Sequence, residues 1–417
     1  MNVLKQVLHD IESGHVKEGL EQLSRLEKQA DHQMKHEIAE LYHELGHVEK
    51  AKKIVDDLLA LYPDEGGLYT FAAELLIDMD EEDEAIEMLQ EIKKEDPAFL
   101  QAQLLLADLY QMQSLDEVAE QKLLLAAKVA PDEVIISYGL GEFYLERGDY
   151  LKSIPFLKKA VHAKESIPNV HIELLLADAY SASGQFEEAL QYYAKGLKNH
   201  LDPNALFGYG FTAYQVGDMI LAIEQLEALR ALDPDYSSLY PYLAKALEAE
   251  GRLDDAFETL EKGLKVDEYN ETLYIHAAKL SFKRQNPEDG EALLRKVIAL
   301  NPSNVEAVQT LAAYLKHSES FDELSELMDH MREYGEEDSM YTWYEATALK
   351  ELDDYEKAYE RYKEIEQTFE EDHDFLEEYG YFLLEYGMRD QAIKYFQKLR
   401  ALQPERMDIV QLLENLQ

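Results

Sequence analysis

Three histidines and a glutamate near the N-terminus have the side chains and the helical spacing to bind a metal ion. In the segment HQMKHEIAELYHELGH they are His36, Glu40, His43 and His47. Steps of four, three and four residues place all four on one face of a helix, and zinc accepts imidazole and carboxylate ligands. The segment is not an HExxH motif, because Glu40 stands where the second histidine would be. A solvated polar helix face explains the same residues, and we expect no metal site.

No other segment combines residues for catalysis. The chain has no cysteine, which excludes disulfides, thiolate nucleophiles and cysteine metal ligands, and which suits a reducing compartment. The segment 208–218, GYGFTAYQVGD, does not complete a GxGxxG phosphate-binding loop. Acid pairs such as those in YGEEDSM and TFEEDHDFLEEYG are read as solvent-facing loops and helix starts. We therefore expect no catalytic residue, no cofactor and no enzyme activity.

The 417-residue chain is strongly acidic, with 86 Asp and Glu against 40 Lys and Arg and a formal net charge of −46. Such a surface repels phosphate backbones and favours either a basic partner or simple solubility. The longest apolar runs, such as LLLAA at 123–127, are too short to span a membrane. The N-terminus lacks the basic flank and apolar run of a signal peptide. We expect a cytoplasmic protein that binds neither nucleic acid nor membranes.

A small residue recurs along the chain with a period of 34 residues. The positions are Ala39, Ala73, Ala107, Gly141, Ala177, Gly210, Ala244, Ala278, Ala312, Ala346 and Gly380, with steps of 36 and 33 only around Ala177. A second small residue follows twelve positions later in each unit except one, where Leu324 stands. A fixed period of this length is typical of stacked structural repeats.

Residues 174–197, LLLADAYSASGQFEEALQYYAKGL, show what each unit contains. Ala177 and Tyr180 lie on one face of a first helix, and Gly184 ends that helix because glycine adopts positive φ without a Cβ clash. Ala189 lies on the facing side of a second helix. Two antiparallel helices at about 8–10 Å leave room only for Ala, Ser or Gly where they cross. One pair cannot bury its apolar face alone, so the pairs must stack.

This pattern resembles the tetratricopeptide repeat (TPR), most clearly in residues 134–167 and 373–406. The chain also resembles stand-alone bacterial TPR proteins. The resemblance implies an all-α, right-handed superhelix (an α-solenoid) of about twelve 34-residue helix-turn-helix repeats over residues 1–406. Residues 407–417 would form a C-terminal capping helix. Family members that are enzymes carry an attached catalytic domain, for which the repeats leave no room.

Three departures predict local irregularities. The first unit has Val7 and Gly19 at its two small positions. The unit at 305–338 has Leu324 and lacks a turn glycine, which predicts a splayed helix pair. Pro155 falls inside a second helix, where it removes a hydrogen bond, and the spacing lengthens soon after it. We expect an irregular joint near 150–170 within one array.

The resemblance implies that partners bind along the concave face of the first helices, where the residue after the first small position points inward. That position is occupied by Glu40, Glu74, Asp108, Glu142, Asp178, Phe211, Lys245, Lys279, Ala313, Thr347 and Tyr381, with Lys316 and Lys350 near the same groove. The acids and then the lysines would make a groove that changes from acidic to basic and steers a charged partner. Alternatively the charges serve solubility.

Aromatic side chains add candidate anchors to this face. Phe207 and Phe211 share a stripe that coincides with the predicted groove, and Trp343 is a weaker third. Most aromatics at helical spacing belong to the core, because they bury large areas. Relatives that grip a chaperone's C-terminal carboxylate use Asn at the inward position, and no matching Asn stands here.

We therefore expect a non-catalytic protein-interaction scaffold or adaptor that binds a peptide or helix of partly basic character. One alternative is a peptide-sensing regulator, but such relatives carry an N-terminal effector domain, whereas the repeat phase here starts within the first few residues. A metal-dependent enzyme at the histidine stripe is a further alternative. The sequence does not fix the oligomeric state.

Overall fold

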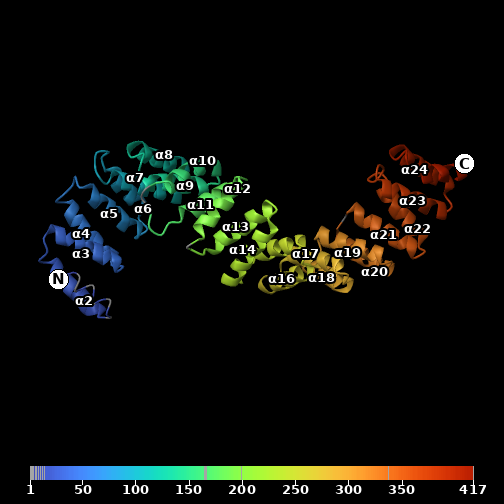
Figure 1. Cartoon of the computed structure of the whole chain (residues 1–417), viewed down its shortest axis with the longest axis horizontal. Helices are drawn as coiled ribbons and strands as arrows, with labels where there is room; N and C mark the ends of the chain where they lie inside the picture. The colour runs from blue at the N-terminus through green and yellow to red at the C-terminus, as the bar shows by residue number, and fades with distance from the viewer. Residues whose placement is uncertain are drawn as a thin grey trace. The chain divides into compact units, whose positions relative to one another are not determined.

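The computed structural model describes residues 4, 7, 9, 11, 13, 15–163, 167–198, 200–336 and 338–416. Over these residues the chain forms helices α2 to α25 and no strand (Figure 1). The helices group into two compact units, Met1–Val216 (unit 1) and Gly217–Gln417 (unit 2). None of the described helices is long and apolar enough to cross a membrane.

Unit 1 alternates first (A) and second (B) helices of the repeats. The A helices are α3 (His32–Glu44), α5 (Gly66–Ile77), α7 (Phe99–Met112), α9 (Val134–Glu146), α11 (Ile172–Ala182) and α13 (Pro203–Gln215). The B helices are α2 (Val16–Glu27), α4 (Val48–Leu59), α6 (Glu82–Gln90), α8 (Asp116–Val129), α10 (Tyr150–Val161) and α12 (Phe186–Gly196). From α2 to α13 each helix contacts the next one along the chain, as in a stack of hairpins.

Unit 2 follows the same alternation. Its A helices are α15 (Leu239–Ala249), α17 (Glu271–Lys283), α19 (Val305–His317), α21 (Ser339–Glu351) and α23 (His373–Glu385). Its B helices are α14 (Met219–Leu232), α16 (Leu253–Val266), α18 (Pro287–Leu300), α20 (Phe321–Glu333), α22 (Tyr355–Ile365) and α24 (Arg389–Leu402). At the predicted capping position α25 (Met407–Leu416) packs on α24 and buries Ile409 and Leu413.

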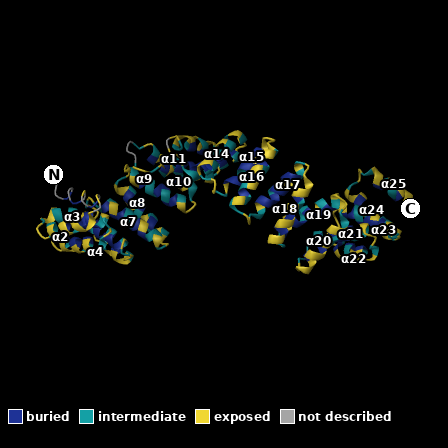
Figure 2. Cartoon of the chain, turned by 90° about the horizontal axis from the view of Figure 1, so that it is seen from below, coloured by how far each residue is buried: buried dark blue, intermediate teal, exposed yellow. Residues whose placement is uncertain are grey.

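The small residues lie where paired helices meet. All eleven first positions from Ala39 to Gly380 are buried, and so are the second positions twelve residues later. A Cβ added at Gly141 would lie 2.5 Å from the Leu157 side chain, and one at Gly380 would lie 2.8 Å from Phe396. Such contacts are too short for real Cβ atoms, so the packing itself requires glycine there. Figure 2 shows buried residues gathered where neighbouring helices face each other.

The turn between the A and B helices has one backbone conformation in glycine and non-glycine repeats alike. Gly46, Gly148, Gly184, Gly217, Gly251 and Gly387 have positive φ, between 74° and 84°. In the remaining turns the equivalent positions are Asp80, Ser114, Gln285, Glu319 and Asp353, with φ between 57° and 64°. A side chain in this left-handed region is strained relative to glycine. The stack imposes the turn whether or not the sequence supplies glycine.

The helix pair α19 and α20 is splayed, as the departure at 305–338 predicts. Its two helices pack less closely than the pairs α17/α18 and α21/α22. Leu324, fully buried, occupies the place of the small residue and holds the helices apart. The absent turn glycine is not the cause, because Glu319 adopts the usual turn conformation at φ 57°.

Pro155 lies inside α10, which runs without interruption from Tyr150 to Val161. Residues 164–166 of the expected joint lie outside the described residues. The division into compact units falls after Val216 instead. The joint near 150–170 stays a prediction, as do the array limits of 1–406 and the capping role of 407–417.

Candidate functional site

The five acids predicted to point inward lie on successive A helices of unit 1, and most have a polar neighbour. His36 Nδ1 is 3.5 Å from Glu40 Oε1. Gln101 donates to Glu74 at 2.9 Å, Tyr138 donates to Glu142, and Tyr193 donates to Asp178 at 2.5 Å. Burial raises the pKa of Asp178 to about 6; the Tyr193 hydrogen bond opposes this rise, and Asp202 adds to it.

Asp108, on α7, is the acid most affected by its neighbours. Reduced solvation of its carboxyl, together with the charges of Glu142 and Glu146 on α9, raises its pKa to about 6. Among the described residues, no lysine or arginine forms an ion pair with any of these three acids. Three carboxylates on two adjacent A helices therefore repel one another without a compensating cation.

Two histidines of the predicted metal-binding stripe contact different carboxylates. His43 Nε2 lies 2.6 Å from Asp78 Oδ2, whereas His36 pairs with Glu40. Both rings pack beside Phe71, with centroids 5.6 and 5.7 Å away. Across the described part of the chain, no three His, Asp or Glu side chains are placed to hold a metal ion.

Three of the four predicted groove lysines form ion pairs with acids of the same unit. Lys279 Nζ lies 2.5 Å from Glu306, and Lys316 Nζ lies 2.8 Å from Glu378. Lys350 Nζ is 3.1 Å from Glu351 and 3.7 Å from Glu385. Lys245 is exposed, with its ammonium 5.6 Å from the centroid of the Tyr242 ring. The lysines therefore add little net positive charge to the A helices that carry them.

Phe207 and Phe211 lie one turn apart on α13. Their rings stack with centroids 6.2 Å apart, and both side chains are half-buried. Their neighbour Tyr209 stacks on Tyr193 of α12 at 5.8 Å. The pair is thus partly accessible, and its role as a binding anchor stays a prediction.

A cavity of about 980 Å³ in unit 2 brings together Lys316, Lys350 and Trp343. We call it the inner-face cavity, because it lies on the face of α21 that carries the predicted inward residue Thr347. Its walls come from α19, the start of α20, α21 and α23. The other lining residues are Ala313, His317, Glu319, Phe321, Met340, Tyr344, Glu351, Asp372, Asp374 and Glu378. The splayed pair α19/α20 forms one side of it.

Glu378 is the polar centre of this cavity. Its Oε1 accepts hydrogen bonds from Trp343 Nε1 (3.1 Å), Thr347 Oγ1 (2.6 Å) and Tyr362 OH (2.7 Å). Its Oε2 accepts one from Lys316 Nζ (2.8 Å). Burial alone would raise the pKa of Glu378, but the Lys316 charge and these hydrogen bonds outweigh burial and lower the pKa below 4.5.

Trp343 is held rigidly beside this carboxylate. Only 8% of the residue is exposed, and its ring packs against Phe369 at 5.1 Å and Phe375 at 5.3 Å between centroids. The Lys316 ammonium lies over the ring, 5.7 Å from its centroid. This is a cation–π contact, so the aromatic floor of the cavity already accommodates a cation.

The rim of the cavity is acidic. Glu319 lies in the turn before α20, and Asp372 and Asp374 lie at the start of α23. All three are exposed, and within the described residues no lysine or arginine pairs with them. Asp372 also caps α23, accepting a hydrogen bond from the Phe375 backbone N–H at 2.9 Å.

Comparison with known proteins identifies the family. The model for YpiA-like, C-terminal tetratricopeptide repeats matches residues 340–406, and the model for YpiA-like, tetratricopeptide repeats matches residues 111–159. The TPR repeat-containing protein YpiA of Bacillus subtilis (strain 168) is 43% identical over 364 residues, which cover 87% of this chain and 86% of that protein. The chain belongs to the YpiA-like family of tetratricopeptide repeat proteins.

Other similarities extend to more distant TPR proteins. General tetratricopeptide repeat models match residues 144–207, 247–315 and 212–270. The TPR repeat-containing protein MJ1428 of Methanocaldococcus jannaschii is 28% identical over 41% of this chain and 29% of its own length. The crystal structure of YrrB, titled a TPR protein with an unusual peptide-binding site, shares 16% identity and a TM-score of 0.40 over 45% of this chain and 96% of its own.

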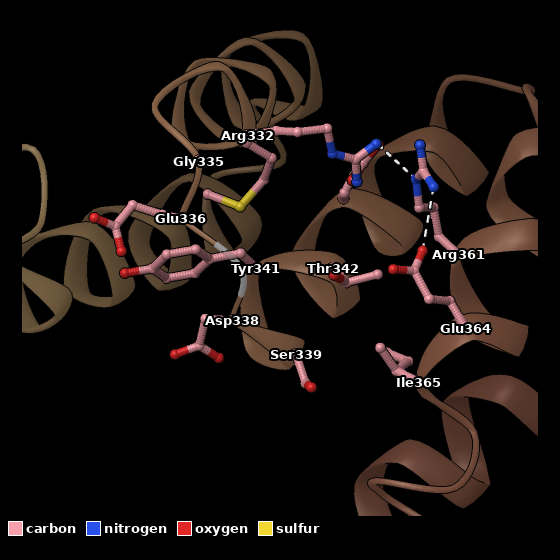
Figure 3. Close-up of a pocket in the computed structure, with 12 residues that line it drawn as sticks. Arg332, Gly335, Glu336, Asp338, Ser339, Tyr341, Thr342, Arg361, Glu364 and Ile365 are labelled. Carbon is pink, nitrogen blue, oxygen red and sulfur yellow. Dashed lines mark hydrogen bonds and ion pairs between the residues drawn. The ribbon is translucent and has the colours of Figure 1, made fainter.

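In this YpiA-like chain the region matched at 340–406 also borders a second cavity, of about 500 Å³, on the opposite face of α21. Buried Glu345 lies between Arg332 of α20 and Arg361 of α22, and Arg361 Nε is 2.9 Å from Glu345 Oε1. Figure 3 shows the guanidinium groups of Arg332 and Arg361 near each other, away from Asp338 and Ser339. Because Glu345 bridges both guanidinium groups, this cluster ties α20, α21 and α22 together.

Sequence reasoning missed Glu378, Glu306 and Glu345, the acids that neutralise basic residues of unit 2. Apart from a few lysines and aromatics, only the residue after each small position was read as inward. Glu378 lies three residues before Tyr381, which places it on the same helix face one turn earlier. Reading the inward face at this spacing as well would have found it.

Proposed function

We propose that the protein is a non-catalytic scaffold that binds a protein partner through an extended or helical segment of basic character. Membership of the TPR family supports a role in protein interaction in general. The proposed binding surface is the inward row of acids on the A helices of unit 1, Glu40, Glu74, Asp108, Glu142 and Asp178.

The observation that carries this proposal is the uncompensated charge around Asp108. Burial of its carboxyl, with the charges of Glu142 and Glu146, raises the pKa of Asp108 to about 6, and no lysine or arginine among the described residues pairs with these three acids, so their mutual repulsion is uncompensated. A lysine or arginine from a partner would relieve that repulsion and lower the pKa. In unit 2, by contrast, Lys279, Lys316 and Lys350 are already paired within the chain.

Charge reversal tests the proposal. We expect the triple variant Glu74→Lys, Asp108→Lys, Glu142→Lys to lose the partner that the wild-type protein recovers from an extract of its own cells. The matched control is Asp57→Lys, Glu87→Lys, Glu117→Lys, which makes the same charge change at exposed positions of B helices. Circular dichroism should show equal helix content for all three proteins. Equal recovery by both triple variants would refute the proposed surface.

A further inference from the structure

We propose that the inner-face cavity binds an arginine side chain of the partner's basic segment. This inference rests on the proposed function and adds to it a second contact, in unit 2, with a stated chemistry. The cavity volume of about 980 Å³ lies at the upper end of the range of small-molecule pockets, so the cavity has room for an arginine side chain.

A carboxylate is the ligand that the two lysines of the cavity first suggest, and the geometry argues against it. Lys316, Thr347, Tyr362 and Trp343 direct their donors at Glu378, so the chain's own carboxylate already fills the anion site. Lys350 is likewise paired with Glu351 and Glu385. An incoming carboxylate would have to displace these partners.

The charge that remains is negative. Glu319, Asp372 and Asp374 face the cavity without a basic partner among the described residues. Their exposure leaves the carboxylates open to a ligand, and Asp372 uses one oxygen for its cap. The rim therefore attracts a cation.

The floor distinguishes arginine from other cations. Phe321 and Tyr344, which line the cavity, are half-buried, and the third lining aromatic, Trp343, packs edge-on against Phe375. A guanidinium group stacks on aromatic faces and at the same time donates paired hydrogen bonds to carboxylates. A lysine ammonium is more strongly hydrated and lacks the planar fork. The combination of aromatic floor and carboxylate rim thus favours arginine.

Trp343 is the chain's single tryptophan, so its fluorescence reports on this cavity alone. The experiment titrates the full-length protein with acetyl-Ala-Ala-Arg-Ala-Ala-amide, following fluorescence and calorimetry on the same samples. Peptides with citrulline, lysine or glutamate in place of arginine serve as controls. We expect a saturable change in Trp343 fluorescence with the arginine peptide. The affinity should be about tenfold or more lower for the citrulline peptide. The lysine peptide should bind more weakly than the arginine peptide, and the glutamate peptide should not bind.

The rim is tested by the variant Glu319→Gln, Asp372→Asn, Asp374→Asn, in which Asn at position 372 keeps a residue suited to the helix cap. We expect the affinity for the arginine peptide to fall about tenfold or more. The control Glu356→Gln, Glu360→Gln, Asp390→Asn removes the same charge from exposed sites on α22 and α24 and should bind as the wild type does.

Three results would overturn the assignment: no saturation with the arginine peptide up to about 1 mM, equal binding of arginine and citrulline or of arginine and glutamate, or unchanged binding in the rim variant. These failures are separable from failure of the scaffold role. If charge reversal at Glu74, Asp108 and Glu142 still abolishes partner recovery, only the cavity assignment falls.

Discussion

Lys316 and Glu378 are separated by 62 residues in the chain, yet Lys316 Nζ and Glu378 Oε2 are 2.8 Å apart. The ion pair joins α19 to α23 across the intervening helix α21, and thereby links three successive repeats. Thr347 and Trp343 of α21 donate to the same carboxylate. One carboxylate thus holds three A helices in register on the face proposed to bind a partner.

Loss of this carboxylate is expected to destabilise unit 2. Glu378→Gln removes the negative charge that pairs with Lys316 and accepts hydrogen bonds from the Thr347 and Tyr362 hydroxyls. This loss should lower the free energy of unfolding by about 1–3 kcal/mol. The control is Glu360→Gln, at an exposed position of α22. Chemical denaturation followed by Trp343 fluorescence measures the difference.

The effect of Glu378→Gln is expected to depend on pH. Because the pKa of Glu378 is lower in the folded protein than its ordinary value of 4.5, the unfolded state binds more protons below that pH. The stabilisation is fully present above pH 4.5 and is lost as the pH falls through the folded pKa. Denaturation curves at several pH values should therefore converge for wild type and variant in acid. A difference that stays constant with pH would contradict the ion-pair account.

Asp108 is expected to behave in the opposite sense. Its folded pKa of about 6 lies above the ordinary 3.8, so the folded state binds the extra proton between these values. Stability should fall as the pH rises through this window. Asp108→Asn is therefore expected to be more stable than the wild type at pH 7, with no difference below pH 3.8. Thermal unfolding checks this, with Asp57→Asn on α4 as the exposed control; a less stable Asp108→Asn at pH 7 would argue against crowded charge.

The close approach of paired helices predicts opposite effects of alanine at two helical glycines. Gly141→Ala places a Cβ 2.5 Å from Leu157 and should cost about 1–3 kcal/mol of stability. Gly67, in the first turn of α5, has no atom within 4 Å of an added Cβ. There alanine should stabilise by about 0.5–1 kcal/mol, because glycine is unfavourable inside a helix. Similar shifts in both variants would show that the packing argument is wrong.

Because the A–B turns share one left-handed backbone conformation, glycine is expected to stabilise the turns that lack it. Gln285 has φ 60° in the turn where the preceding repeat has Gly251 at φ 74°. Gln285→Gly should raise stability by about 1 kcal/mol by removing left-handed strain, and Gly251→Ala should lower it by a similar amount. Thermal midpoints measured for both variants check the pair, and a loss of stability in Gln285→Gly would contradict it.

Much of the fold follows from the sequence, because the repeat is dictated by local sterics. The 34-residue spacing of small residues fixes where helices cross, and Leu324 marks the splayed pair α19/α20. The turn at Glu319 was harder to read: nothing in HSESFDE replaces the expected glycine, yet stacking of the neighbouring helices imposes the same backbone.

The site is less accessible to sequence reasoning. The positions of Lys316 and Lys350 on the inward face follow from periodicity, but the pairing of their ammonium groups with acids does not. It depends on Glu378 and Glu385, whose side chains reach the lysines from the following repeats. The lysines that the sequence places in the second half of the groove are therefore largely paired with acids. Such pairing between repeats depends on side-chain packing, which the 34-residue period does not specify.

The most direct test of the scaffold role is affinity recovery from an extract of the cells that make the protein, at low and at raised salt, read by mass spectrometry. The wild type, the Glu74/Asp108/Glu142 charge reversal and its B-helix control would be compared side by side. We predict one dominant protein partner, recovered by wild type and control, lost at raised salt and absent from the charge-reversed variant. A partner set that is the same for all three proteins and unchanged by salt would contradict recognition by the acidic A helices.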